Sequence, residues 1–400
     1  MEEPASQGRR KVPLEDVSSL LTAIRPTSKK ARQPPGSGLT PFALHLAKQL
    51  AKGGDGEGKN LVFSPLSIYA ALALVAAGAR GDTLDEFLTV LGAESRDELA
   101  EFVRHAAESA LADRSGSGGP RVAYACGVWH DQSSALKPAY RAAAVESYKA
   151  ETRAVDFKSK PKEAREEINS WVSKATNKLI PTILPEGSVH SRTTLVLGNA
   201  IYFKGMWSKP FAQKDTRDKR FYRLDGSYVR APFMHSVKNQ FVEEHDGFKV
   251  LKLPYQMRRL RPRFSMCVFL PDARDGLPSL LEEIASSPDF LKDHLLTLSS
   301  VRVGEFRLPK FKLSFFRSME DVLKDMGIEA AFDEKAVIEV NEEGTEAAAS
   351  TMCTVARKCA RIIRRPVDFI ADHPFAFFLM EEESGAVVFM GLVLDPTESE

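Results

Sequence analysis

The chain has 400 residues, and its 55 lysines and arginines against 54 aspartates and glutamates give a formal net charge of +1 at pH 7. This balance excludes binding to nucleic acid or to an anionic membrane by bulk charge. The composition, 43% hydrophobic and 27% charged, excludes disorder over most of the chain. The longest nearly apolar run, residues 65–79, is shorter than the ~20 residues of a membrane-spanning helix. We therefore expect neither nucleic acid nor a membrane as a partner.

The cysteines and the N-terminus bear on the compartment. The four cysteines form no CxxC pair and are too few for a disulfide framework. No apolar stretch follows a basic start at the N-terminus, so no secretory signal is expected. These features favour the cytosol, with extracellular action only after release from the cell.

Residues 1–38 are predicted to be a disordered basic arm. They hold five prolines and seven basic residues against four acidic ones. The basic clusters at 9–11 and 29–32 have two interpretations, nuclear-import signals or part of a solvated tail.

Helical patterns fill most of the first half of the chain. Thr40 followed by Pro41 predicts the start of a helix that ends at Gly53. Ser64 is predicted to cap an apolar helix that runs through Ala79. Further helices are predicted over 82–91, 98–111, 138–148 and 162–180, the last with Ile168, Trp171, Val172 and Ala175 on one face.

Strand patterns dominate from residue 193 onwards. β-rich runs between turn residues are found at 195–203, 248–253, 264–270, 301–308 and 387–394. Several are apolar on both faces, so they belong in sheets that are covered on both sides. Helices first and strands later predict an α+β single domain with large mixed sheets.

Motifs for catalysis and for metal binding are missing from the sequence. We find no GxSxG, HExxH, GxxxxGK[ST] or GxGxxG motif and no paired Cys/His metal spacing. The histidines are spaced singly, and no nearby pattern supplies a base for Cys353 or Cys359. The sequence therefore predicts no enzyme, no metal and no cofactor.

The most unusual segment is 340–356, which is rich in small residues. As a strand it would present an uncharged face of small or β-branched side chains: Thr345, Ala347, Ala349, Thr351, Cys353 and Val355. Such a face can enter a sheet without burying a charge, which costs several kcal/mol. An alanine-rich helix or linker is the alternative.

This segment carries a family resemblance. It resembles the proximal hinge of the reactive-centre loop of serpins, in particular the plant serpin-Z group: Glu342, Glu343, Gly344, Thr345, Glu346, Ala347, Ala348, Ala349 and Ser350. Residues 60–68 resemble the shutter of the family, 199–207 its breach strand, and 168–172 its sixth helix. Residues 264–271, 309–313 and 372–375 follow in the family's order, so the resemblance covers about 39–396.

The resemblance implies a serpin fold of three β-sheets and about eight or nine helices. A single domain over 39–396 would expose a reactive-centre loop at about 342–366, followed by a tail at 397–400. The resemblance implies that a protease cuts this loop, and that the cut loop then inserts into the large sheet and traps the enzyme as an acyl complex. The resemblance further implies a monomer, with shutter and breach residues Ser64, Ser67, Asn199, Lys204 and Trp207.

The position of the cut follows from the family's loop length. The seventeenth residue from Glu342 is Lys358, which predicts Lys358–Cys359 as the reactive bond and Arg357–Lys358 as the runner-up. Five basic residues and no acid between 357 and 365 favour proteases with acidic clefts. The expected partners are trypsin-like serine proteases, kexin-type dibasic enzymes, or metacaspases and papain-like cysteine proteases. Cys359 is either redox-sensitive or a tolerated replacement for serine.

The segment before the hinge departs from the family. Between residues 328 and 340 the chain lacks a block that holds a short helix and the first half of the neighbouring strand, and Glu334-Lys335 stands for a His-Lys pair. A shortened strand would give an inserting loop fewer backbone partners. A non-inhibitory serpin that binds a partner through its basic loop is therefore the second hypothesis.

Overall fold

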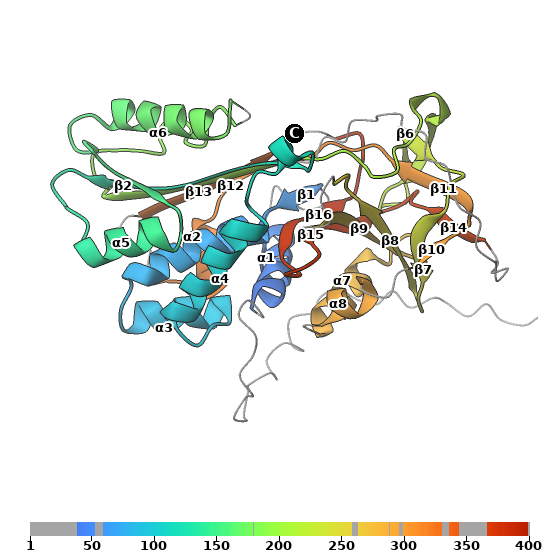
Figure 1. The fold of residues 1–400 in the computed structure, drawn as a ribbon, viewed down its shortest axis with the longest axis horizontal. Helices are drawn as coiled ribbons and strands as arrows, with labels where there is room; N and C mark the ends of the chain where they lie inside the picture. Colours follow the sequence, from blue (N-terminus) through green and yellow to red (C-terminus); the bar gives the residue numbers. More distant parts are fainter. Residues whose placement is uncertain are drawn as a thin grey trace, which may run out of the picture. The chain divides into compact units, whose positions relative to one another are not determined.

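The computed structural model describes residues 38–52, 59–178, 180–257, 263–287, 289–295, 299–329, 336–343 and 366–398. The predicted arm, apart from Gly38, and most of the predicted reactive-centre loop, 344–365, lie outside the described residues. Within the described part the strands form three sheets, which we name A, B and C (Figure 1).

Each sheet combines strands that are distant in the sequence. Sheet A has the order β12 (Ser314–Ser318), β13 (Ala336–Glu343), β4 (Leu195–Lys204), β2 (Arg121–Asp131), β3 (Glu151–Val155). Sheet B has the order β1 (Leu61–Phe63), β16 (Val387–Val393), β15 (Phe375–Glu381), β9 (Phe264–Pro271), β8 (Phe248–Pro254), β7 (Gln240–Glu244), β10 (Ser300–Val301). Sheet C has the order β14 (Val367–Ile370), β11 (Val303–Pro309), β6 (Tyr228–His235), β5 (Arg217–Tyr222).

Nine α-helices accompany these sheets within the described ranges. They are α1 (Leu39–Lys52), α2 (Pro65–Gly78), α3 (Asp82–Leu91), α4 (Arg96–Ser109), α5 (Pro138–Glu146), α6 (Pro161–Ala175), α7 (Leu277–Ser286), α8 (Phe290–Leu295) and α9 (Glu320–Asp325). The predicted α+β class, with three sheets and about nine helices, is confirmed.

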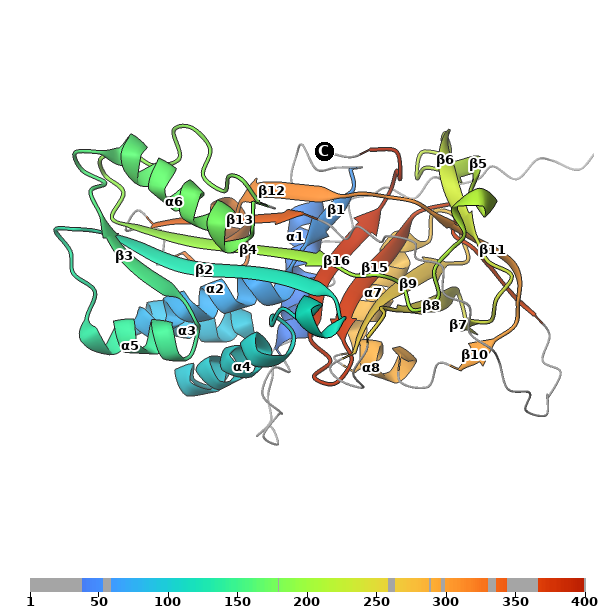
Figure 2. The same cartoon turned by 45° about the horizontal axis from the view of Figure 1, so that its top comes forward.

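Sheet A is covered on both faces. Helix α6 lies across one face, and α2 to α5 lie on the other (Figure 1, Figure 2). On the α6 side, Ile168 and Val172 are fully buried in one cluster with Trp129 of β2. On the α2 side, Leu197 and Ile201 of β4 join the main core. The apolar runs of the sequence are therefore explained by burial on two sides.

Helix α2 is buried almost all round because its sequence offers no polar face. Its residues are apolar apart from Ser67 and Tyr69, and most of them are buried. A helix that is hydrophobic on every side belongs in the interior. Helix α2 therefore lies in the interior, where it contacts β4 of sheet A and β16 of sheet B.

Some predicted boundaries were wrong. Thr40 is not a cap, because α1 begins at Leu39 and the amide of Phe42 already bonds to the Gly38 carbonyl. Helix α6 ends at Ala175 rather than at 180, since the next residues include Asn177 with a φ of 54°. Ala175 is exposed, and Thr176 is buried in its place. The prediction that it shares the buried face was therefore wrong.

Candidate functional site

The strand that leads into the predicted hinge lies inside sheet A. Strand β13 pairs in parallel with β4, from Ala336 opposite Leu195 to Glu343 opposite Tyr202. Its other edge pairs antiparallel with β12. Glu342 and Glu343 are thus the last residues of a strand between two others. The remaining hinge residues, 344–350, and the bonds Arg357–Lys358 and Lys358–Cys359 lie outside the described residues.

The chain re-enters the described structure in a different sheet. Pro366 precedes β14, which forms the edge of sheet C and pairs in parallel with β11. The 22 residues 344–365 therefore connect a central strand of one sheet to the edge strand of another. Both ends of the predicted loop are anchored by strand pairing.

Strand β13 pairs along most of β4. Its eight residues pair with eight of the ten residues of β4, starting at Leu195, the first residue of β4. That this strand is shorter than the corresponding strand of the family stays a prediction. The connection between α9 and β13 consists of residues 326–335.

The predicted shutter residues meet below the middle of β4. Ser64 caps α2, and its Oγ accepts a hydrogen bond of 3.1 Å from the amide of Ser67. The Asn199 side chain on β4 donates from Nδ2 to the carbonyl oxygen of Ser67 at 2.5 Å. All three residues are buried, with at most 1% of their surface exposed. A hydrogen bond thus links the first turn of α2 to β4, the strand that pairs with β13.

Two buried polar atoms at the shutter have no hydrogen-bond partner among the described residues. They are Ser67 Oγ and Asn199 Oδ1. The hydroxyl of Tyr124 on β2 interacts with the side chains of Cys126 and Asn199. Burial raises the pKa of Tyr124 well above its usual value and that of Cys126, opposite Asn199, to about 11. Unpartnered buried polar atoms each cost ~1–3 kcal/mol. Because Asn199 is paired with Val340, this cost falls at the junction of β4 and β13.

The predicted breach residue Trp207 connects sheet A to sheet B. Its indole stacks on Tyr255 with ring centroids 4.5 Å apart, and the two residues form an isolated antiparallel bridge. Gly205 permits this approach, since a Cβ there would lie 2.4 Å from the Tyr255 ring. Ser208 also donates its amide to the Pro254 carbonyl at 2.9 Å. The end of β4 is thus fixed to the end of β8.

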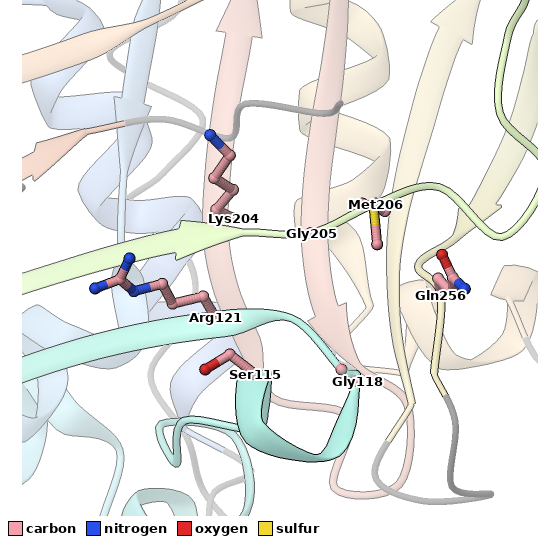
Figure 3. A pocket seen from close by; sticks show the side chains of 8 residues that line it. Ser115, Gly118, Arg121, Lys204, Gly205, Met206 and Gln256 are labelled. Atoms are coloured by element: carbon pink, nitrogen blue, oxygen red, sulfur yellow. The ribbon is translucent and has the colours of Figure 1, made fainter. Parts of the chain in front are cut away.

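Lys204, the other predicted breach residue, lines a small pocket at this junction. The pocket has a volume of about 150 Å³, and Arg121 at the start of β2 lies directly opposite Lys204. Figure 3 shows both basic side chains on the strand ends, with Ser115 and Gly118 of the turn before β2 below them and Met206 and Gln256 on the other side. The breach therefore presents two cations, one at the end of β4 and one opposite it at the start of β2.

Sequence reasoning missed the contacts that hold α6 against sheet A. Trp129 packs edge-on against Trp171 with centroids 5.0 Å apart. Its indole lies over Gly127 and Gly198, which are paired across β2 and β4, and a Cβ at Gly127 would lie 2.4 Å from the ring. Asn169 accepts the amides of the segment after α6. The glycines in apolar runs were the available signal, since they mark a close approach.

The part of the chain that the structure describes offers no metal centre and no membrane span. It contains no group of three or more His, Cys, Asp or Glu side chains that could hold a metal ion. None of its helices is both long and apolar enough to cross a bilayer.

Known proteins resemble this chain over most of its length. Serpin-Z2A and Serpin-Z2B of Oryza sativa subsp. japonica are each 53% identical to it, with 90–91% of this chain and 97–98% of those proteins covered. Arabidopsis AtSerpin1, solved in its native stressed conformation, is 36% identical with a TM-score of 0.82, covering 92% of this chain and all of that one.

The family comparison also locates the departure found in the sequence. The family described as "Serpin (serine protease inhibitor)" matches residues 37–336 and 333–396, two ranges that overlap where β13 begins. The alignment with Serpin-Z2A runs over 419 positions, more than the 400 residues of this chain, so that relative holds residues that this chain lacks. The family match covers residues 37–396, and the chain belongs to the serpin family of serine protease inhibitors, with plant serpin-Z proteins among its similar relatives.

Proposed function

We propose that this serpin inhibits trypsin-like proteases as a suicide substrate, with Lys358–Cys359 as the reactive bond and residues 342–350 as the hinge. The observation that carries the proposal is the position of β13. It lies directly beside β4, and the small-residue segment continues from its end. No strand lies between these two in the described sheet.

The pairing of β13 with β4 gives insertion a physical reason. These two strands are parallel, and parallel pairs are slightly less stable per residue than antiparallel ones. A strand that folds back from the end of β13 would run antiparallel to both neighbours. Insertion would then replace one parallel interface by two antiparallel interfaces. The uncharged face from Thr345 to Val355 allows this without burial of a charge.

The residues around the bond favour a protease with a carboxylate in its specificity pocket. Lys358 follows Arg357, and Arg361, Arg364 and Arg365 come soon after. Such a cluster favours an acidic cleft through charge complementarity. We expect the protein to act as a monomer, and the target protease, bound through this loop, to be its partner.

The missing block supports a second function, that of a non-inhibitory serpin which binds a partner through its basic loop. Opening sheet A between β4 and β13 separates β12 and β13 from β4, β2 and β3. The connection from α9 to β13 is only ten residues long, 326–335, and a short connection restrains any movement of β13 in this opening. If sheet A does not open, a protease would cleave the loop and dissociate without forming a stable covalent complex.

The test is to incubate the purified protein with a trypsin-like serine protease. A denaturing gel detects the covalent complex, and mass spectrometry identifies the released C-terminal peptide. A complex with a peptide that begins at Cys359 would support inhibition at the proposed bond, whereas a peptide that begins at Lys358 would identify the runner-up.

Two variants serve as matched controls. Lys358→Ala should abolish complex formation, and Arg357→Ala, one residue away, should retain it. Complete cleavage of the wild-type chain without any complex would contradict the inhibitory proposal and favour the second function.

A further inference from the structure

Two histidines and two phenylalanines form an aromatic cluster where α8 meets the turn between β7 and β8. His245 of the turn stacks on Phe248 at the start of β8, with ring centroids 4.9 Å apart. His294 of α8 stacks on Phe290, one helical turn earlier, at 4.0 Å. The two imidazole rings meet edge to face, with centroids 4.7 Å apart. These four residues, which we name the histidine cluster, join α8 to the end of sheet B (Figure 1).

The hydrogen bonds of the histidine cluster suit neutral imidazoles. His294 Nδ1 lies 2.7 Å from the carbonyl oxygen of Phe290. A carbonyl oxygen only accepts, so this nitrogen carries the hydrogen, and Nε2 is the site for a second proton. His245 Nε2 is buried and has no hydrogen-bond partner among the described residues. A charged His245 would therefore hold a buried N–H group without an acceptor, which costs free energy.

The charges around the cluster do not offset this cost. Burial lowers the pKa of His245, and the neighbouring His294 lowers it further. Glu243 of β7 and Glu283 of α7 act in the opposite direction but do not reverse the shift. The other charged side chains on the surrounding elements are paired with each other or exposed: Glu244 with Lys249 in an ion pair of 3.2 Å, and Asp246, Asp272, Glu282, Asp289, Lys292 and Asp293 at the surface.

We infer that the histidine cluster is a pH-sensitive switch, in which proton uptake by His245 and His294 releases α8 from the β7–β8 turn in mildly acidic solution. Release would expose the rings of Phe248 and Phe290, which are only 2% and 6% exposed in the docked form. The switch is independent of the proposed function, because no residue of the reactive-centre loop takes part in it.

The direction of the switch follows from the lowered pKa of His245. In the released form its ring takes up a proton near the ordinary histidine pKa of ~6.5, whereas the docked form does so only at lower pH. The stabilisation of the docked form is therefore complete well above pH ~6.5 and is lost as the pH falls through that value towards the folded pKa. A second proton on His294 would place two cations in rings 4.7 Å apart, and these repel each other.

The experiment follows amide hydrogen exchange of the intact chain by mass spectrometry at a series of pH values from about 7.5 to 5, corrected for the intrinsic effect of pH on exchange. The readout is the exchange of α8, and the reference is α4, which carries the exposed His105. His245→Phe keeps a ring beside Phe248 and removes the proton site. The double variant H245F/H294F removes both sites, and His105→Phe makes the same change at the exposed position as a matched control.

In the wild-type protein, exchange of α8 should become about tenfold faster than that of α4 between pH 7.5 and pH 5. His245→Phe should reduce this acid response, H245F/H294F should nearly abolish it, and His105→Phe should leave it unchanged. If the double variant does not fold, His294→Phe alone tests the same cluster and should also weaken the response.

Three results would overturn the inference. The first is an equal change in α8 and α4, which would show global loosening in acid. The second is slower exchange of α8 in acid, which would show that Glu243 or Glu283 pairs with the charged rings and strengthens the contact. The third is a full acid response in folded variants that lack His245 or both histidines, which would assign the response to other groups.

Discussion

At the scale of single residues, two serines at the start of α2 offer a direct test of the shutter. Ser64 and Ser67 are both fully buried, but only Ser64 Oγ has a hydrogen-bond partner in the described structure. Ser64→Ala should lower the free energy of unfolding by ~1 kcal/mol, as the loss of a helix cap does. Ser67→Ala should be neutral or stabilising, because it removes an unpartnered buried hydroxyl. Urea unfolding of both variants measures the difference, and an equal loss would show that Ser67 Oγ has a partner.

The hinge offers a second test at this scale. Thr345 belongs to the uncharged face that would enter sheet A, and Glu346 belongs to the opposite face. Thr345→Arg should turn the protein from an inhibitor into a substrate, because insertion would then bury an unpaired charge.

The measurement for Thr345→Arg is the stoichiometry of inhibition against trypsin. Glu346→Arg, which adds the same side chain one residue away, is the control and should leave the stoichiometry unchanged. A Thr345→Arg protein that still traps one protease per molecule would contradict insertion of this face.

At the scale of elements, Asp395 joins three strands that are distant in the sequence. Its carboxylate accepts a hydrogen bond of 2.7 Å from Nε of Arg223, just after β5. Its backbone amide donates at 2.9 Å to Oδ1 of Asn60, just before β1, and the residue itself follows β16. Burial alone would raise the pKa of Asp395. Hydrogen bonds from Thr397 and Arg223 outweigh burial and lower it below the usual value.

A lowered pKa in the folded state predicts how this junction responds to acid. The stabilisation is complete above the usual aspartate pKa of ~3.9 and is lost as the pH falls through the lower folded value. Asp395→Asn should therefore lower the urea midpoint at pH 7, and the difference from wild type should shrink towards pH 3. Asp246→Asn, at an exposed position, is the control. A difference that stays constant with pH would show that the charge of Asp395 is not involved.

The helices and strands also show how much of the fold the sequence predicts. Apolar runs such as β9, buried at every residue, and capped helices such as α2 were predicted correctly because burial and caps leave local patterns. Strand β2 was missed because its alanines and glycine make room for α6 on one face, so its pattern is not that of an ordinary strand. The family motifs located Asn199 and Trp207, whereas the stacking on Tyr255 depends on strand pairing that no local pattern encodes.

At the scale of the whole molecule, the arrangement of sheet A predicts that cutting the loop makes the protein more stable. The inserted segment would pair with β4 on one side and β13 on the other, which adds about ten to twenty backbone hydrogen bonds at ~0.5–1.5 kcal/mol each. The ordering of the inserted residues offsets part of this gain.

The prediction is tested by cleaving the loop with a catalytic amount of trypsin and comparing the thermal unfolding of the intact and cleaved proteins. The midpoint should rise by roughly 10 °C or more while the C-terminal fragment stays associated through β15 and β16. Thr345→Arg, cut in the same way, should show a much smaller rise, since the cut is identical and only insertion is blocked. If the wild-type protein is cut and its midpoint does not change, the short connection before β13 prevents sheet A from opening, and the non-inhibitory function becomes the better explanation.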